Sequence, residues 1–180
     1  VGGFSRRLVA PGLAPQDLPA LSAVLVSHRH FDHLSRGSFP ALEGRTPTVL
    51  VPPGAGRDVP PGSYLTEELP AWGTWESDGL RVTAVPVAHE GGRYLADNKA
   101  HPRAFTGYVI EHRGVTVYFP GDTAYRQELF AAVARRFPRI DLALLPIGPR
   151  TPTAMMRPSH LDPLQALQAA LPIDAALSSA

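Results

Sequence analysis

The chain has 180 residues, a formal net charge of +1 and 44% hydrophobic residues, which is enough apolar material for one core of ordinary size. The near balance of charge argues against a protein that wraps nucleic acid, because such proteins concentrate cations to neutralise phosphate. The absence of cysteine excludes disulfides, thiolate metal sites and thiol nucleophiles, so any metal site must use His, Asp and Glu.

Short apolar runs rich in β-branched residues predict strands at intervals along the whole chain. The predicted strands are 23–26, 48–51, 80–87, 105–111, 115–119 and 141–145, and a further strand begins at Ala175. We expect a hairpin between the fourth and fifth of these strands, across His112, Arg113 and Gly114. Residues 52–75 are rich in Pro and Gly and are interpreted as irregular connection.

Two later segments have the apolar spacing of amphipathic helices. The first, 127–137, ends before Pro138 and carries apolar side chains on one face, namely Leu129, Phe130, Val133 and Phe137. The second is expected to begin at Asp162, which can cap a helix N-terminus, with Pro163 in the first turn. It runs through Leu164, Leu167 and Leu171 and stops before Pro172.

The most informative segment directly follows the predicted strand 23–26. It contains three of the seven histidines and one aspartate, in the order His28, His30, Asp32 and His33. In an extended backbone His28 and His30 share one face, because side chains alternate with a period of two. A turn into a helix then delivers Asp32 and His33 to an adjacent position, which suits two metal ions side by side. Imidazole and carboxylate ligands without thiolate fit Zn²⁺, with Fe and Mn as alternatives.

The motif His28-x-His30-x-Asp32-His33 resembles the signature of the metallo-β-lactamase-fold hydrolases. Two later segments resemble that family in the same order along the chain. His89 follows the predicted strand 80–87, and Gly121-Asp122-Thr123 follows the predicted strand 115–119. The resemblance implies an α+β fold in which two sheets pack between outer helices, an αββα sandwich.

The same resemblance implies a binuclear centre with two zinc ions. The residues that match the family's ligands are His28, His30, Asp32, His33, His89 and Asp122. The first two histidines and His89 would hold one ion. Asp32 and His33 would hold the second, with Asp122 bridging the pair. A hydroxide shared by two such ions attacks the substrate, so no Ser or Cys nucleophile is required. His101 and His112 match no ligand motif, and His112 is interpreted as a hairpin-turn residue.

Further blocks resemble a narrower branch, the N-acyl-phosphatidylethanolamine phospholipase D-like branch of the β-lactamase superfamily domain. These blocks are Arg7-Leu8-Val9-x-Pro11-Gly12-Leu13, Gly92-Arg93-x-Leu95-x-Asp97-Asn98, residues 141–148 and Met156-Arg157-Pro158-x-His160-x-Asp162-Pro163. In that branch the histidine matching His160 lies near the substrate, so His160 and Asp32 are the candidate catalytic residues. The alternative for His160 is a helix-entry residue beside the cap Asp162. The chain departs from the branch at 149–152 and at Ala124, which adjoin the pocket.

The function implied by this resemblance is a zinc-dependent hydrolase that uses a metal-bridging hydroxide on a phosphodiester, in the manner of a phospholipase D. The alternatives are a lactone or sugar-phosphate ester hydrolase of the same fold, or a non-catalytic metal-binding module. The expected partner is a small-molecule or lipid ester and not a nucleic acid. No apolar run is long enough for a transmembrane segment and no leader is visible, so we expect a cytoplasmic protein, with peripheral membrane contact for a lipid substrate. No feature of the sequence specifies an oligomeric state.

The ends of the chain carry a separate expectation. The family's fold opens with strands before the segment that begins this chain, and it closes with a strand that delivers a last histidine ligand. No histidine follows His160. Residues 1–180 are therefore interpreted as one partial domain, incomplete at both ends, with a second metal site that is one ligand short.

Overall fold

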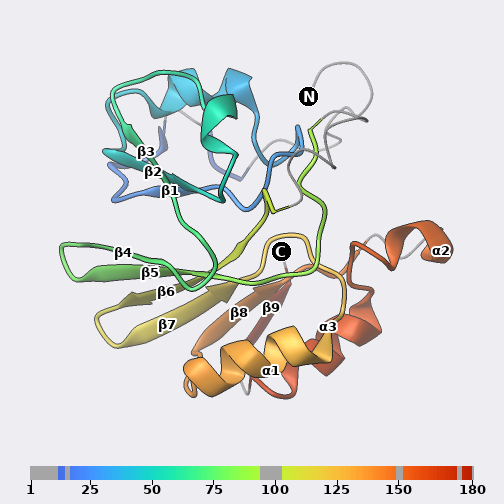
Figure 1. The fold of residues 1–180 in the computed structure, drawn as a ribbon. Coiled ribbons are helices and arrows are strands. Elements are labelled where there is room, and N and C mark those ends of the chain that lie inside the picture. The colour runs from blue at the N-terminus through green and yellow to red at the C-terminus, as the bar shows by residue number, and fades with distance from the viewer. Residues whose placement is uncertain (1–11, 15–16, 94–102, 149–151, 174–175, 180) are drawn as a thin grey trace.

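The computed structural model describes residues 12–14, 17–93, 103–148, 152–173 and 176–179. Two β-sheets face each other, one with strand order β1-β2-β3 and the other with order β4-β5-β6-β7-β8-β9 (Figure 1). The helices α1 (Gln127–Arg136) and α3 (Pro163–Ala170) cover the outer face of the larger sheet. These sheets and helices confirm the expected α+β sandwich.

The smaller sheet is entirely parallel and consists of β1 (Val24–Leu25), β2 (Thr48–Val51) and β3 (Leu65–Glu68). All residues of the central strand β2 are buried, as its unbroken apolar run predicts for a parallel strand covered on both faces. The outer face carries short 3₁₀-helices, η2 (Arg36–Leu42) and η3 (Gly56–Asp58).

The interpretation of residues 52–75 as irregular connection is wrong in part. This stretch contains β3 and the start of β4 (Thr74–Ser77). Every residue of β3 is exposed, and the strand is held by backbone pairing with β2 from Thr48 to Val51. Because its side chains do not enter a core, no apolar periodicity marks it in the sequence.

The larger sheet combines an antiparallel half with a parallel half. Strands β4, β5 (Leu80–Val85), β6 (Gly107–His112) and β7 (Val115–Phe119) are antiparallel neighbours. Strands β8 (Leu142–Leu145) and β9 (Ala176–Ser179) continue the sheet in parallel with β7. Helix α1 connects β7 to β8, and α2 (Thr153–Met156) and α3 lie between β8 and β9. The predicted strands and helices of this half are confirmed, with ends that differ by a few residues.

Two tight hairpins shape the antiparallel half. Strand β6 turns into β7 through Arg113 and Gly114, whose φ angles are 48° and 79°. Strand β4 turns into β5 through Asp78 and Gly79, whose φ angles are 49° and 77°. Positive φ at both central positions defines the type I′ turn, whose twist matches that of paired strands. The predicted hairpin is confirmed, but its turn has two residues, because His112 already pairs with Val115.

Helix α3 confirms the predicted start but turns its leucines outward. Asp162 accepts a hydrogen bond from the backbone N–H of Gln165 at 2.8 Å, and the Gln165 side chain accepts one from the Asp162 N–H. This reciprocal pair is a capping box. The buried face is formed by Ala166, Ala169 and Ala170. The exposed side chains are Leu164, Leu167 and Leu171.

Tyr108 ties the two sheets together between their inner faces. Its side chain is fully buried, and its hydroxyl donates to the carbonyl oxygen of Val26 at 2.8 Å. Beside it, buried residues of both sheets form one apolar cluster, with Leu50 and Leu69 packed against Val82 and Ala84.

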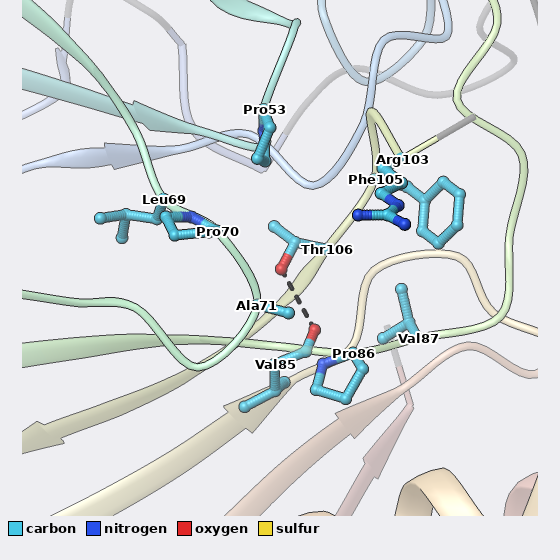
Figure 2. Close-up of a pocket in the computed structure, with 10 residues that line it drawn as sticks. All are labelled: Pro53, Leu69, Pro70, Ala71, Val85, Pro86, Val87, Arg103, Phe105 and Thr106. Carbon is cyan, nitrogen blue, oxygen red and sulfur yellow. Dashed lines mark hydrogen bonds between the residues drawn. The ribbon is translucent and has the colours of Figure 1, made fainter. Parts of the chain in front are cut away.

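An apolar cavity of about 260 Å³ also lies between the sheets (Figure 2). Its walls include Leu69, Val85, Val87 and Phe105, and the Thr106 hydroxyl donates to the Val85 carbonyl at 3.1 Å beside it. None of the residues predicted to bind metal lines this cavity. Within the described residues, no helix has both the length and the apolar composition that crossing a membrane requires.

Candidate metal centre

The segment 28–34, called the histidine turn, is anchored to both sheets. It follows β1, and His28 forms an isolated β-bridge with Phe105, just before β6. The N–H of Thr106 donates to the carbonyl oxygen of Ser27 at 2.7 Å. The side chain of His28 is 1% exposed. The smaller sheet therefore delivers the histidines at the point where its chain meets the larger sheet.

The structure brings His28, His30 and His89 together, with one ring nitrogen from each within 4.8 Å of the others. The Nδ1 atom of His30 lies 2.9 Å from Nε2 of His28 and 3.3 Å from Nε2 of His89. Two nitrogens bound to one tetrahedral Zn²⁺ at about 2.0–2.1 Å are about 3.4 Å apart. The spacing of this group, site A, therefore fits a single ion.

A second group, site B, joins His28 to His33 and Asp122 within the same 4.8 Å limit. The Oδ2 atom of Asp122 lies 3.3 Å from Nε2 of His33 and 4.0 Å from Nε2 of His28. Because His28 belongs to both groups, Asp122 lies beside both sites. The bridging role of Asp122 stays a prediction.

Asp32 belongs to neither group among the described residues. Its side chain is 69% exposed, and its Oδ2 atom lies 3.6 Å from Nε2 of His33. The sequence predicts Asp32 as a ligand of the second ion, and in the structure its carboxylate lies at the edge of site B, beside His33.

His160 does reach the site. Its Nδ1 atom lies 3.7 Å from Oδ2 of Asp122, and its ring centre is 5.4 Å from that of His89. The helix-entry description also holds, since His160 precedes the cap Asp162. His112 lies at the end of β6, where its Nδ1 is 3.2 Å from the Gly79 carbonyl oxygen, and His101 lies outside the described residues.

Two serines outside the family motifs, Ser159 and Ser27, contact the clustered histidines. Nδ1 of His89 lies 3.0 Å from the carbonyl oxygen of Ser159, which can only accept a hydrogen bond. The proton of His89 must therefore reside on Nδ1, which leaves the Nε2 lone pair facing site A. The Ser27 hydroxyl lies 3.0 Å from Nδ1 of His28 and, as a group that can donate or accept, holds this ring in place by a hydrogen bond. Sequence reasoning missed both serines, because one acts through its backbone and the other precedes the motif.

The Gly-Asp-Thr turn is attached to the loop that carries His89. The Thr123 hydroxyl accepts a hydrogen bond from the N–H of Ala88 at 3.0 Å. The N–H of Ala124 donates to the Ala88 carbonyl at 2.7 Å. These bonds fix the position of Asp122 relative to His89, although the two residues are far apart in the sequence.

The electrostatics keep site A in a form that can bind metal. Burial lowers the pKa of His28 and of His30, and it lowers the pKa of His89 to about 4. Imidazoles with lowered pKa values are neutral at pH 7, so no proton competes with a metal ion for their lone pairs.

In site B the Asp122 carboxylate and the His33 imidazole shift each other's pKa. Burial is the largest single effect on His33 and would lower its pKa, but the hydrogen bond with Asp122 and the negative charges of Asp122 and Asp32 together raise it. Burial alone would raise the pKa of Asp122, yet His33 and the nearby imidazoles lower it. An ionised carboxylate beside imidazole nitrogens, without thiolate, is a donor set that fits Zn²⁺ or another first-row ion.

Comparison with known proteins agrees with this geometry. Residues 1–178 match the family described as the β-lactamase superfamily domain. The chain is 30% identical over 179 residues to N-acyl-phosphatidylethanolamine-hydrolyzing phospholipase D 1 of Caenorhabditis elegans, covering 91% of this chain and 49% of that protein. It is 33% identical over 163 residues to a metal-dependent hydrolase of Thermococcus onnurineus, covering 81% of this chain and 66% of that protein.

The fold has a counterpart among solved structures. A metallo-β-lactamase fold protein of Bacillus subtilis is similar with a TM-score of 0.64 and 16% identity, covering 88% of this chain and 64% of that one. The chain spans about half the length of the Caenorhabditis elegans relative. Given the family match over residues 1–178 and the two facing sheets, the chain belongs to the β-lactamase superfamily domain family and has the metallo-β-lactamase fold.

Proposed function

We propose that this chain is the metal-binding part of a zinc-dependent hydrolase that acts on a phosphodiester. The observation that carries the proposal is the convergence of nitrogens from His28, His30 and His89 within 4.8 Å of one another, beside His33 and Asp122. Site A would hold one ion. Site B would hold a second, with Asp32 at its edge. Such a pair of ions would supply a nucleophile from water at neutral pH and would neutralise charge on the ester oxygens.

The protein's own groups determine how a substrate would lie. Asp122 has a lowered pKa and stays ionised, so its carboxylate would bind the ions of both sites. It also orients His33, whose Nε2 atom lies 3.3 Å away. The Nδ1 atom of His160 is buried, lies 3.7 Å from Asp122 and has no hydrogen-bond partner within the described part of the chain. In the proposal this ring donates a hydrogen bond to a phosphoryl oxygen of the substrate. The exposed Asp32 carboxylate is the group placed to accept a proton at the rim.

The choice of a phosphodiester rests on relatives. The Caenorhabditis elegans relative hydrolyses N-acyl-phosphatidylethanolamine, as its name says. The resemblance to that branch implies a place near the substrate for His160. The departures from the branch at 149–152 and Ala124 leave the proposed metal-binding groups unchanged, and residues 149–151 lie outside the described residues. A lactone or a sugar-phosphate ester is therefore included in the test.

The test compares the unaltered protein with Asp122→Ala and His160→Ala, using metal analysis and hydrolysis of bis(4-nitrophenyl) phosphate and of a simple lactone. Asp122→Ala should lose metal and lower turnover by about 100-fold or more, because its carboxylate serves both sites. His160→Ala should keep its metal and lower turnover by about 100-fold, the contribution of one positioned acid or hydrogen-bond donor. His112→Ala, on an exposed hairpin, should change neither quantity.

Three other results would contradict the substrate class, the catalytic role or the site assignment. Lactone turnover without phosphodiester turnover would replace the proposed substrate class. Bound metal without hydrolysis of either ester would identify a non-catalytic metal-binding module. Unchanged metal content and turnover in Asp122→Ala would disprove the assignment of the site.

A further inference from the structure

Two buried arginines hold the histidine turn by hydrogen bonds: Arg29 within the turn and Arg93 in the loop after His89. Arg29 lies between His28 and His30 in the sequence, yet its side chain is 3% exposed and its Nε donates to Oδ2 of Asp58 at 2.6 Å. It also donates from Nη1 to the carbonyl oxygen of Gly91 at 3.4 Å. Arg29 thus connects the turn to η3 on one side and to the loop after His89 on the other.

Arg93 contacts the histidine turn at three of its residues. Residue 93 is 7% exposed, and its Nη1 donates to the carbonyl oxygens of Arg29 and Leu34, both at 2.8 Å. Its guanidinium carbon lies 4.3 Å from the centre of the Phe31 ring. A single cation therefore contacts the beginning, the middle and the end of the turn.

Within the turn, the carbonyl oxygen of His30 accepts hydrogen bonds from the N–H groups of His33 at 3.1 Å and Leu34 at 2.8 Å. The turn is thus closed inside by backbone bonds and outside by Arg93. His30 contributes to site A and His33 to site B. A change in the curvature of the turn would therefore change the separation between the two sites.

We propose that Arg93 is a positioning residue that clamps the histidine turn and thereby sets the spacing of the ligand nitrogens of His30 and His33. The proposal rests on the proposed metal function for its consequence, but the clamp itself is a property of the metal-free protein. The planar guanidinium suits the task, because it donates to two carbonyls while its face lies on an aromatic ring. Since Arg93 follows His89 by four residues, it also links the loop of His89 to the ligands of the turn.

The first measurement is hydrogen exchange in the metal-free protein, resolved at the amides of His33 and Leu34. Arg93→Ala should speed their exchange at least about tenfold, because two charge-assisted hydrogen bonds are lost. Arg93→Lys should recover part of the protection, since an ammonium can still donate but cannot lie flat on Phe31. Arg81→Ala removes an exposed arginine whose partner is Glu76, and it should leave these amides unchanged.

The second measurement is a Co²⁺ titration followed by the visible absorption of the bound ion. Arg93→Ala should weaken Co²⁺ binding about 10- to 100-fold, the usual cost of losing a group that orients metal ligands, and should alter the absorption spectrum. Arg93→Lys should fall between Arg93→Ala and the unaltered protein. A merely structural role would lower thermal stability without altering the spectrum of the protein that remains folded.

The test also covers a variant that does not fold and a protein that does not bind Co²⁺. Should Arg93→Ala fail to fold, Arg93→Lys and Phe31→Ala carry the test, because residue 31 is 47% exposed and its truncation removes the stacking while both carbonyl partners of Arg93 stay in place. Unaltered exchange in both of these variants would overturn the clamp. Failure of the unaltered protein to bind Co²⁺ would refute the proposed function. The clamp would still be tested, because hydrogen exchange is measured in the metal-free protein.

Discussion

At the scale of single residues, Gly121 determines how closely the Asp122 turn approaches the histidines. Its φ is +63°, and a Cβ atom there would lie 2.5 Å from Cβ of Ser27. Ser27 in turn contacts Nδ1 of His28. Only glycine combines the left-handed conformation with this close approach. The glycine of the Gly-Asp-Thr motif is thus required by packing against the strand that leads to His28.

We expect Gly121→Ala to lower the free energy of unfolding by about 2–4 kcal/mol, from backbone strain and overpacking together. Gly114→Ala is the matched control, because Gly114 has φ +79° with no atom within 4 Å of the added Cβ. It should cost only about 1 kcal/mol, for the left-handed backbone. Urea unfolding of both variants measures the difference. Equal losses would show that contact with Ser27 has no energetic weight.

At the scale of elements, the pair Arg29–Asp58 joins the histidine turn to η3. Both side chains are largely buried, with 3% and 11% of their surfaces exposed. Arg29→Ala would leave the Asp58 carboxylate buried and uncompensated, so we expect a loss of about 3–5 kcal/mol in the free energy of unfolding. In the exposed pair Arg81–Glu76, at a similar N–O distance of 2.7 Å, Arg81→Ala should cost under about 1 kcal/mol. Denaturant unfolding of the metal-free variants compares the two, and similar costs would contradict this prediction.

A carboxylate also joins strands β7 and β8, and its effect depends on pH. Asp141 accepts a hydrogen bond from the N–H of Thr116 at 2.8 Å and from Nε of Arg139 at 3.0 Å. The Thr116 bond, followed by Arg139, lowers the pKa of Asp141. A lowered folded-state pKa means that the stabilisation is present above the pKa of the unfolded chain. It is lost as the pH falls through the folded-state value.

We therefore expect Asp141→Asn to be less stable than the unaltered protein at pH 7. The gap should close as the pH is lowered from about 5 to about 2, the range in which carboxyl groups take up protons. Urea unfolding of both proteins at each pH gives the difference and cancels the titration of the other carboxylates. If the difference in stability persisted undiminished at low pH, its cause would be packing and not the charge of Asp141.

At the scale of the whole molecule, the two proposed metal sites bring together residues from parts of the chain that fold into different sheets. His28, His30 and His33 follow β1 of the smaller sheet, whereas His89 and Asp122 follow β5 and β7 of the larger sheet. Tyr108 and the apolar cluster around it also connect the two sheets, as does the bridge between His28 and Phe105. An ion bound at site A or B would therefore add a link between the two sheets.

We expect Zn²⁺ to raise the stability of the whole molecule. At a free concentration one hundred times the dissociation constant, the gain from one site is about 2.7 kcal/mol, because only the folded chain presents the assembled site. Thermal unfolding with added Zn²⁺ and with a chelator measures the shift. His28→Ala, which removes a ligand of both sites, should abolish it. A midpoint that does not respond to Zn²⁺ in the unaltered protein would count against both sites.

The sequence by itself determined the features that local chemistry controls. β-branched runs such as 48–51 need burial, so they predict strands, and Asp162 with Pro163 predicts a helix start from capping alone. The His-x-His-x-Asp-His order likewise predicts a metal site, because its spacing places several ligands on one short turn. The pair Asp78-Gly79 is a further local signal, typical of a type I′ hairpin, that marks the turn between β4 and β5.

Only the tertiary structure decided which groups surround the ligands and which faces are buried. The exposed strand β3 is held by backbone bonds to β2, and α3 buries alanines while its leucines face outward. Arg93 reaches the histidine turn across about sixty residues of sequence, with 64 and 59 positions separating it from the two carbonyls it contacts. These features depend on contacts between distant segments and on backbone atoms, which every residue carries, so no local pattern of side chains specifies them.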